Sequence, residues 1–199
     1  MNVKGKPIIR HIIDKVHSAG VNKIIAACHY KPECVREAVG QDAEIIIEPT
    51  PLGTAGAMGL IQPTRPLIVW NGDTLIKDDI APALEYHRKG RFFATVLTAP
   101  HEHRVPWGVV ETDYYAEVKQ GILQAASFVE KPSFKYHVLV GIYIFNTFLS
   151  LTAEQRDMPQ FLNHLCCVEN KRIGVYDVGD WIGIDTPEAL GRANELDWL

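Results

Sequence analysis

Two aspartates occupy positions where an α/β protein places ligand-binding groups. Asp73 follows the apolar run PLIVW (66–70) through Asn71 and Gly72, and Asp185 directly precedes a capped helix near the end of the chain. In an open α/β sheet, ligands bind beyond the carboxyl ends of the strands. Two carboxylates there can hold a hard divalent cation between phosphate oxygens, which suits Mg²⁺. Either aspartate alone is better explained by a turn or a helix cap, so the predicted magnesium site depends on the pair.

A glycine-rich turn and a lysine offer two ways to hold a phosphate or a base. LGTAGA (52–57) runs into a predicted helix, whose backbone N–H groups can face an anion or a base edge. It lacks the G-x-G-x-x-G pattern of dinucleotide-dependent enzymes, and periodicity alone leaves a ligand loop and a plain turn equally open. Lys131 follows the strand-like SFV and Glu130, and it can meet a phosphate as a point charge. A lone lysine is, however, more often a simple surface residue.

Two further groups of residues have spacing that does not suit a metal site. His101, Glu102 and His103 make poor zinc ligands on a loop without additional partners. The four cysteines include no C-x-x-C pair, and the adjacent Cys166 and Cys167 would bond to each other only with strain. We interpret the cysteines as reduced thiols of a cytoplasmic protein.

Composition excludes several classes of partner. The chain is 47% hydrophobic and 22% charged, which is ordinary for a globular protein. Its formal net charge of −4 gives no basic footprint for nucleic acid or an anionic membrane. The sequence shows neither a secretory signal nor an apolar run near the ~20 residues of a membrane span. We therefore expect small-molecule ligands and no nucleic-acid or membrane partner.

Hydrophobic periodicity predicts an alternation of helices and strands. Helical patterns cover residues 7–18, 32–40, 54–61, 80–89, 160–167 and 186–196. Strand-like runs cover residues 23–28, 43–48, 66–70, 91–98, 108–112, 123–129, 138–145 and 172–178. Alternation at short intervals predicts an α/β, Rossmann-like fold with a mixed, mostly parallel sheet and helices on both faces. No repeat or linker divides residues 1–199, so a single domain is predicted.

Eight motifs, in order along the chain, resemble the sugar-phosphate nucleotidyltransferase family. They are GKPIIRHIIDKV, AGVNKIIAACHY, EPTPLGTAGAM, IVWNGD, WGVVETD, FVEKP, GIYIF and WIGIDTPEAL. In sequence detail these motifs are most similar to those of bacterial glucose-, mannose- or heptose-1-phosphate nucleotidyltransferases. The resemblance implies the nucleotide-diphospho-sugar transferase fold and a magnesium-dependent enzyme of nucleotide-sugar synthesis, with a nucleoside triphosphate and a sugar 1-phosphate as substrates. The resemblance allows a homo-oligomer and does not decide the oligomeric state.

The resemblance also implies roles for individual residues. Asp73 would hold magnesium, and Lys131 would meet the sugar phosphate, as the two catalytic residues. Other substrate contacts would come from the LGT turn at the base, and from WGVV, EKP and GIYIF at the sugar. The substrate-binding residues implied in this way are Leu52, Gly53, Thr54, Gly108, Glu130, Lys131 and Gly141. A phosphate oxygen of the sugar would attack the α-phosphorus in line, and catalysis would be positioning and charge neutralisation.

Three features depart from the family pattern. Members open with a central strand and a glycine-rich loop, with Arg and Lys, that cradles the triphosphate. No such segment precedes GKP here, so we expect a sheet without its first strand and a chain that is inactive by itself. Asp185 lies two positions from the family's usual carboxylate, which leaves Asp180 as the alternative second ligand. Leu139 and Val140 stand where an asparagine would bind a sugar hydroxyl, so the sugar stays open, as does the base.

A different class of function also fits these residues. A non-catalytic domain of the same fold, one that senses sugar nucleotides or supports a partner enzyme, would keep the sugar and base contacts without the triphosphate loop. We therefore predict nucleotidyl transfer for the full-length parent protein and keep the sensing or supporting domain as the alternative.

Overall fold

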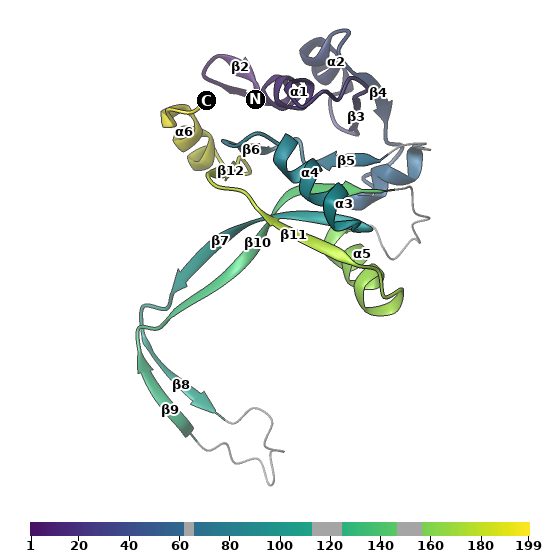
Figure 1. The fold of residues 1–199 in the computed structure, drawn as a ribbon. Helices are drawn as coiled ribbons and strands as arrows, with labels where there is room; N and C mark the ends of the chain where they lie inside the picture. Colours follow the sequence, from purple (N-terminus) through teal and green to yellow (C-terminus); the bar gives the residue numbers. More distant parts are fainter. Residues whose placement is uncertain (62–65, 113–124, 147–156) are drawn as a thin grey trace. The chain divides into compact units, whose positions relative to one another are not determined.

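The computed structural model describes residues 1–61, 66–112, 125–146 and 157–199 (Figure 1). The chain folds into two compact units. Unit 1 consists of Met1–Ala99 and Leu139–Leu199, and unit 2 consists of Pro100–Val138. The chain passes from one unit to the other within strands β7 (Ala94–Arg104) and β10 (Ser133–Phe145). The single domain predicted for residues 1–199 stays a prediction.

A four-stranded mixed sheet forms the centre of unit 1. Its strand order is β11 (Ile173–Asp177), β7, β10 and β5 (Leu67–Trp70). β11 pairs in parallel with β7, whereas β5 pairs antiparallel with β10. The part of β10 in unit 1 is buried from Val140 to Phe145. A strand covered on both faces needs a continuous apolar run of this kind rather than an alternating one. The predicted α/β fold with a mixed sheet is confirmed.

Smaller sheets flank this centre. β3 (Ile25–Cys28) pairs in parallel with β4 (Glu44–Ile47), and β6 (Thr74–Ile76) pairs antiparallel with β12 (Trp181–Gly183). A two-residue hairpin joins β1 (Asn2–Val3) to β2 (Lys6–Pro7). Antiparallel pairs therefore take a larger share than the predicted mostly parallel sheet allows, because β5 runs against β10 and because β6 and β12 are too short to stand out as apolar runs. Among the described residues, β3 pairs only with β4, and β5 pairs only with β10.

The helices begin close to the residues that sequence signals indicated. α1 (Ile8–Ser18) follows Pro7, and Gly20, just beyond its end, has φ +81°. The Thr186 hydroxyl accepts the N–H of Ala189 at 3.1 Å, as an N-cap residue should. The other helical elements are α2 (Pro32–Val39), α3 (Gly53–Gly56), the 3-10 helix η1 (Ala57–Leu60), α4 (Ala81–Gly90), α5 (Met158–Asn163), the π-helical η3 (His164–Val168) and α6 (Pro187–Glu195).

Helix α1 is shared between two apolar clusters. Ile8, Ile12 and Val16 pack in one cluster, together with Leu75 of β6 and Ile182 of β12. Ile13, one position further round the helix, belongs instead to a cluster with Ala26 of β3 and Val39 of α2. The i, i+3, i+4 pattern of isoleucines predicted this amphipathic helix, and the width of its apolar stripe explains how it serves both clusters.

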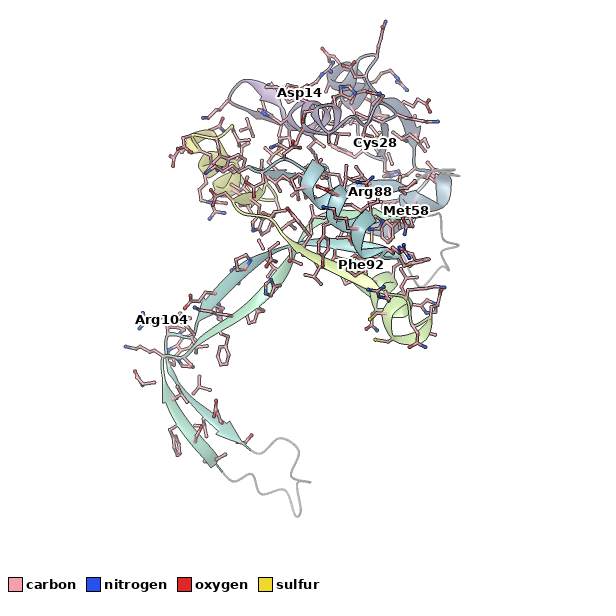
Figure 2. The ribbon with its side chains drawn as sticks, in the orientation of Figure 1. Asp14, Cys28, Met58, Arg88, Phe92 and Arg104 are labelled. Carbon is pink, nitrogen blue, oxygen red and sulfur yellow. The ribbon has the colours of Figure 1, made fainter. Side chains whose placement is uncertain are left out.

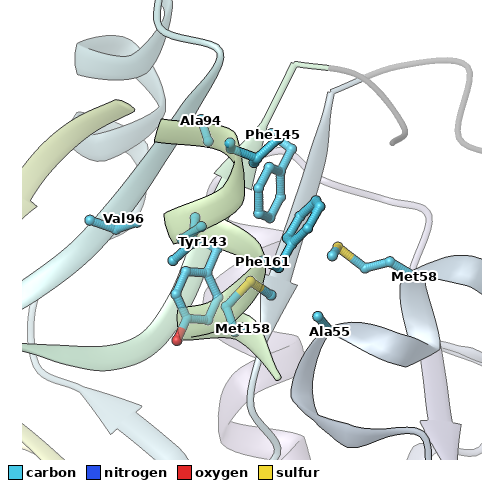
Figure 3. Close-up of a cluster of buried hydrophobic side chains, with 10 residues drawn as sticks. Ala55, Met58, Ala94, Val96, Tyr143, Phe145, Met158 and Phe161 are labelled. Atoms are coloured by element: carbon cyan, nitrogen blue, oxygen red, sulfur yellow. The ribbon is translucent and has the colours of Figure 1, made fainter. Parts of the chain in front are cut away.

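The core on the α5 side of the sheet contains two helical segments from distant parts of the sequence (Figure 3). Ala55 of α3 and Met58 of η1 pack with Met158 and Phe161 of α5 over the apolar face of β7 and β10. The rings of Phe145 and Phe161 lie 5.9 Å apart, centroid to centroid, in a tilted arrangement that aromatic pairs favour. This cluster holds the glycine-rich segment at residues 52–57 against the sheet.

Unit 2 contains the hairpin of β8 (Gly108–Thr112) and β9 (Ala125–Glu130), with the outer parts of β7 and β10. β8 and β9 are antiparallel, and Gly108 lies opposite Glu130. The strand predicted over 123–129 begins at residues outside the described ranges, and its described part is β9. The last residue of the WGVVETD motif, residue 113, also lies outside the described ranges.

Candidate active site

The Asn71–Asp73 turn connects β5 to β6 in unit 1. The N–H of Thr74 donates to the carbonyl oxygen of Asn71 at 3.2 Å and closes the turn. The N–H of Asn71 donates to the carbonyl oxygen of Gly141 at 2.9 Å, so the turn is fastened to β10. The side chain of Asp73 is exposed, and its Oδ1 lies 3.4 Å from the Thr74 hydroxyl. The turn therefore presents a carboxylate to solvent at the end of a half-buried strand.

Asp185 lies at the same end of the β6–β12 pair as Asp73. Gly183 is opposite Thr74, and the N–H of Ile184 donates to the carbonyl oxygen of Asp73 at 2.7 Å. Asp185 is the next residue, and its side chain is also exposed. Among the described residues neither Asp73 nor Asp185 forms an ion pair. Two accessible carboxylates on adjoining strand ends are a donor set that fits Mg²⁺, which prefers one or two carboxylates together with phosphate and water oxygens.

Asp180 occupies the opposite end of that strand pair. Its carbonyl oxygen accepts the N–H of Lys77 at 2.8 Å, and its carboxylate lies 3.1 Å from the Lys77 ammonium. The hydrogen bond from the Lys77 ammonium to the Asp180 carboxylate, and then the negative charge of that carboxylate, raise the pKa of Lys77. Lys77 is four positions after Asp73, and at ~3.3 Å per residue that places Asp180 roughly 13 Å along the strand from Asp73. The register thus brings Asp185, and not Asp180, to the Asp73 end.

Gly141 adjoins the Asn71–Asp73 turn directly. Its φ is +81°, in the left-handed region, and a Cβ there would lie 2.7 Å from Nδ2 of Asn71. Only glycine combines this backbone conformation with this close approach. Gly141, predicted near the sugar site, therefore lies against the side chain of Asn71 in unit 1. Its neighbours Val140 and Leu139 differ in exposure, since Val140 is buried and Leu139 is exposed.

The turn at Leu52–Thr54 is held by two side-chain contacts. The N–H of Leu52 donates to Oε2 of Glu48 at 3.1 Å, and the hydroxyl of Thr54 accepts the N–H of Met158 at 2.8 Å. Gly53 has φ +79°, a conformation that glycine adopts without strain. The glycine-rich segment is therefore a shaped turn entering α3, as its sequence indicated.

One pocket of about 530 Å³ joins this turn to the Asn71–Asp73 turn. Gly53 and Thr54 line it together with Asn71 and Gly72. Apolar residues of α1, β3 and β5 form much of the remaining wall, and two further lining residues, Cys28 and Met58, are labelled in Figure 2. Burial, and then the nearby charge of Glu48, raise the pKa of the Cys28 thiol. The pocket thus has polar turns beside an apolar wall, which suits a ligand with a flat apolar part and a few hydrogen-bonding groups.

The sugar-side residues predicted from WGVV and EKP belong to unit 2. Gly108 and Glu130 are paired across the β8–β9 hairpin, and a Cβ on Gly108 would lie 3.2 Å from Oε2 of Glu130. Lys131 has φ +46°, and its N–H donates to the carbonyl oxygen of Trp107 at 3.2 Å. Its ammonium lies 3.7 Å from Oε1 of Glu130, with both side chains exposed. The hairpin end thus presents adjacent acidic and basic groups beside a glycine.

His101, Glu102 and His103 lie within β7 rather than in a loop. The ring of His101 stacks on that of Tyr136 at 6.0 Å, and Glu102 lies 3.8 Å from the Lys135 ammonium. In the described ranges, no group of three or more His, Cys, Asp or Glu residues could hold a metal ion. The four cysteines are free thiols, none of them in a disulfide.

Sequence reasoning did not single out Asn71 or Glu48. Asn71 supplies the contact that requires glycine at position 141, and Glu48 fixes the amide of Leu52. Both residues lie inside motifs of the family resemblance, IVWNGD and EPTPLGTAGAM. Their partners lie across the fold or across a turn, and only the folded geometry identifies them.

Comparison with known proteins identifies the family to which this α/β fold and candidate site belong. Residues 1–193 match the family model for nucleotidyl transferases, and the chain belongs to this family. It is 31% identical over 155 residues to a mannose-1-phosphate guanyltransferase of Yarrowia lipolytica, covering 71% of this chain and 41% of the relative. It is 28% identical over 201 residues to a mannose-1-phosphate guanyltransferase of Pichia angusta, covering 92% and 53%. The chain thus spans about half the length of these relatives.

A solved structure shows the same fold. The crystal structure of a Bacillus anthracis protein assigned as a glucose-1-phosphate thymidylyltransferase, in complex with sucrose, superposes with a TM-score of 0.72. The match covers 98% of this chain and 84% of that one at 19% identity. The predicted nucleotide-diphospho-sugar transferase fold is confirmed. No helix in the described part of the chain is long and apolar enough to cross a membrane.

Proposed function

We propose that this chain carries a sugar-1-phosphate nucleotidyltransferase activity: transfer of a nucleotidyl group from a nucleoside triphosphate to a sugar 1-phosphate, with release of pyrophosphate. The observation that carries the proposal is the placement of Asp73 and Asp185 on adjoining strand ends. The turn that carries Asp73 also lines one pocket with Gly53 and Thr54. Membership of the nucleotidyl transferase family supports the same reaction.

The residues of unit 1 are proposed to hold the nucleotide. Asp73 and Asp185 are the proposed ligands of Mg²⁺, which when bound neutralises triphosphate charge and stabilises the leaving pyrophosphate. Gly53 has no side chain, and its backbone can therefore approach a base closely. The apolar wall of the pocket suits the face of a base, and the exposed Asp73 directly follows Gly72, which lines the same pocket.

The residues of unit 2 are proposed to hold the sugar 1-phosphate. The Lys131 ammonium supplies a positive charge for the phosphate, and the Glu130 carboxylate accepts hydrogen bonds from sugar hydroxyls. Gly108 leaves open the space above Glu130 that a side chain would fill.

The test is a pyrophosphate-release assay on the purified chain with Mg²⁺. The relatives are named mannose-1-phosphate guanyltransferases, so GTP with mannose 1-phosphate is the first pair, followed by ATP, UTP, CTP and dTTP with several hexose 1-phosphates. We expect turnover with one pair and its loss in Asp73→Asn, whereas no turnover with any pair would bear out the expectation from the sequence that the chain is inactive by itself. Turnover that survives Asp73→Asn would contradict the proposal. Nucleotide-sugar binding without turnover, measured by calorimetry, would favour the sensing domain instead.

A further inference from the structure

The hydroxyl of Thr54 caps a helix from a distant part of the chain. It accepts the N–H of Met158, the first residue of α5, at 2.8 Å, across 104 positions in the sequence. The N-cap residue of α5, Asp157, makes no side-chain cap bond. The first N–H groups of a helix lack partners within the helix, and Thr54 therefore supplies an acceptor that α5 does not supply itself.

The turn at Leu52–Thr54 depends on such outside contacts for its shape. It enters α3, a helix of four residues, which is far too short to be stable alone. Ala55, directly after Thr54, is fully buried in the cluster with Met158 and Phe161 (Figure 3). The hydrogen bond from Met158 thus lies beside the apolar contact that joins α3 to α5, and the two fix the turn together.

Helix α5 contributes no residue to the wall of the pocket, whereas Thr54 does. We propose that Thr54 is a positioning residue for the nucleotide: its hydroxyl anchors the Leu52–Thr54 turn on α5, and this anchor sets the affinity for the base. The inference rests on the proposed function. In this inference the Thr54 hydroxyl binds α5, and the backbone of the turn at Gly53 contacts the base.

The test compares two substitutions of Thr54. Thr54→Val keeps the size and branching but has no hydroxyl, and Thr54→Ser keeps the hydroxyl. We expect Thr54→Val to speed amide exchange at Met158 and to raise the Michaelis constant for the nucleoside triphosphate about tenfold, the effect of one lost hydrogen bond with a stranded donor. The Michaelis constant for the sugar 1-phosphate should not change. Thr54→Ser should stay within about twofold of wild type in both constants.

A matched control separates this effect from general destabilisation. The Thr95 hydroxyl bonds to Nδ1 of the buried His87 at 2.8 Å, and Thr95→Val removes that bond away from the pocket. Thr95→Val should lower the melting temperature and leave the Michaelis constant for the nucleotide unchanged.

Three results would overturn the inference. The first is faster exchange at Met158 in Thr54→Val with unchanged nucleotide affinity, which would limit the hydroxyl to stabilising α5. The second is Thr54→Ser as impaired as Thr54→Val, which would assign the effect to the methyl group. The third is unchanged exchange at Met158. Wild-type protein that binds none of the triphosphates would remove the proposed function as well, and that failure is visible before any variant is made.

Discussion

The N–H of Ile184 donates a 2.7 Å hydrogen bond to the carbonyl oxygen of Asp73. This bond continues the β6–β12 register by one residue and places Asp185 beside the Asn71–Asp73 turn. At the other end of the pair, Lys77 and Asp180 make the corresponding backbone contact. The register of this strand pair therefore places Asp185 at the Asp73 end and Asp180 at the other end. The sequence alone left these two aspartates as alternatives for the second magnesium ligand.

The second magnesium ligand can be assigned by comparing three substitutions. Asp73→Asn and Asp185→Asn should each remove most magnesium-dependent turnover, since each replaces an anionic ligand by a neutral one. Asp180→Asn should retain activity, because Asp180 is engaged with Lys77. Turnover against Mg²⁺ concentration distinguishes the three. Loss in Asp180→Asn with near-normal activity in Asp185→Asn would reverse the assignment.

Lys131 should contribute to sugar-phosphate binding through its charge. Lys131→Ala removes the ammonium and should weaken binding of the sugar 1-phosphate by about 1.5–3 kcal/mol, the range for a charged hydrogen bond. Lys135→Ala is the matched control, since Lys135 is another exposed lysine of unit 2, paired with Glu102. Calorimetry with mannose 1-phosphate measures both. Equal losses in the two variants would indicate a general charge effect rather than a site at Lys131.

Gly141 should tolerate no side chain. Gly141→Ala combines φ +81° with a Cβ placed 2.7 Å from Nδ2 of Asn71, and it should reduce the free energy of unfolding by roughly 1–3 kcal/mol. It should also displace the turn that carries Asp73. Gly191→Ala in the exposed middle of α6, where a Cβ meets nothing within 4 Å, should instead stabilise by ~1 kcal/mol. Urea denaturation measures both, and a neutral Gly141→Ala would refute the close contact.

Tyr143 should make stability fall at high pH. Burial raises the pKa of Tyr143, whereas its unfolded pKa is about 10. The folded state then keeps its proton at pH values where the unfolded state loses it. The free energy of unfolding is therefore unaffected below about pH 10 and decreases as the pH rises through the folded pKa.

Phenylalanine at position 143 removes this titration, so Tyr143→Phe should lose less stability than wild type between pH 9 and 11. Tyr136→Phe is the control, because Tyr136 is 45% exposed. Urea midpoints across that range give the comparison. Parallel pH profiles for wild type and Tyr143→Phe would contradict a raised pKa of the Tyr143 phenol.

Local signals in the sequence predicted those parts of the fold whose causes are local. The isoleucine stripe predicted α1, Thr186 with Pro187 predicted the start of α6, and the strand end at Trp70 predicted where Asp73 would lie. The assignment of Asp185 needed the register of β12, a three-residue strand. The Thr54–Met158 and Asn71–Gly141 contacts join residues 104 and 70 positions apart, and no local pattern encodes a pairing over such distances.

The separation of β3 and β4 from the four-stranded sheet has a consequence for cooperativity. Their apolar cluster draws on α1 and α2 and contains no residue of β5, β7, β10 or β11. Between β3 and β5 the contact is a pocket rather than a ladder of hydrogen bonds. Residues 24–47 should therefore open as a sub-global unit, with amide exchange at a lower free energy than in β10. A ligand that fills the pocket would contact both edges, and its binding would appear first as slower exchange in β3.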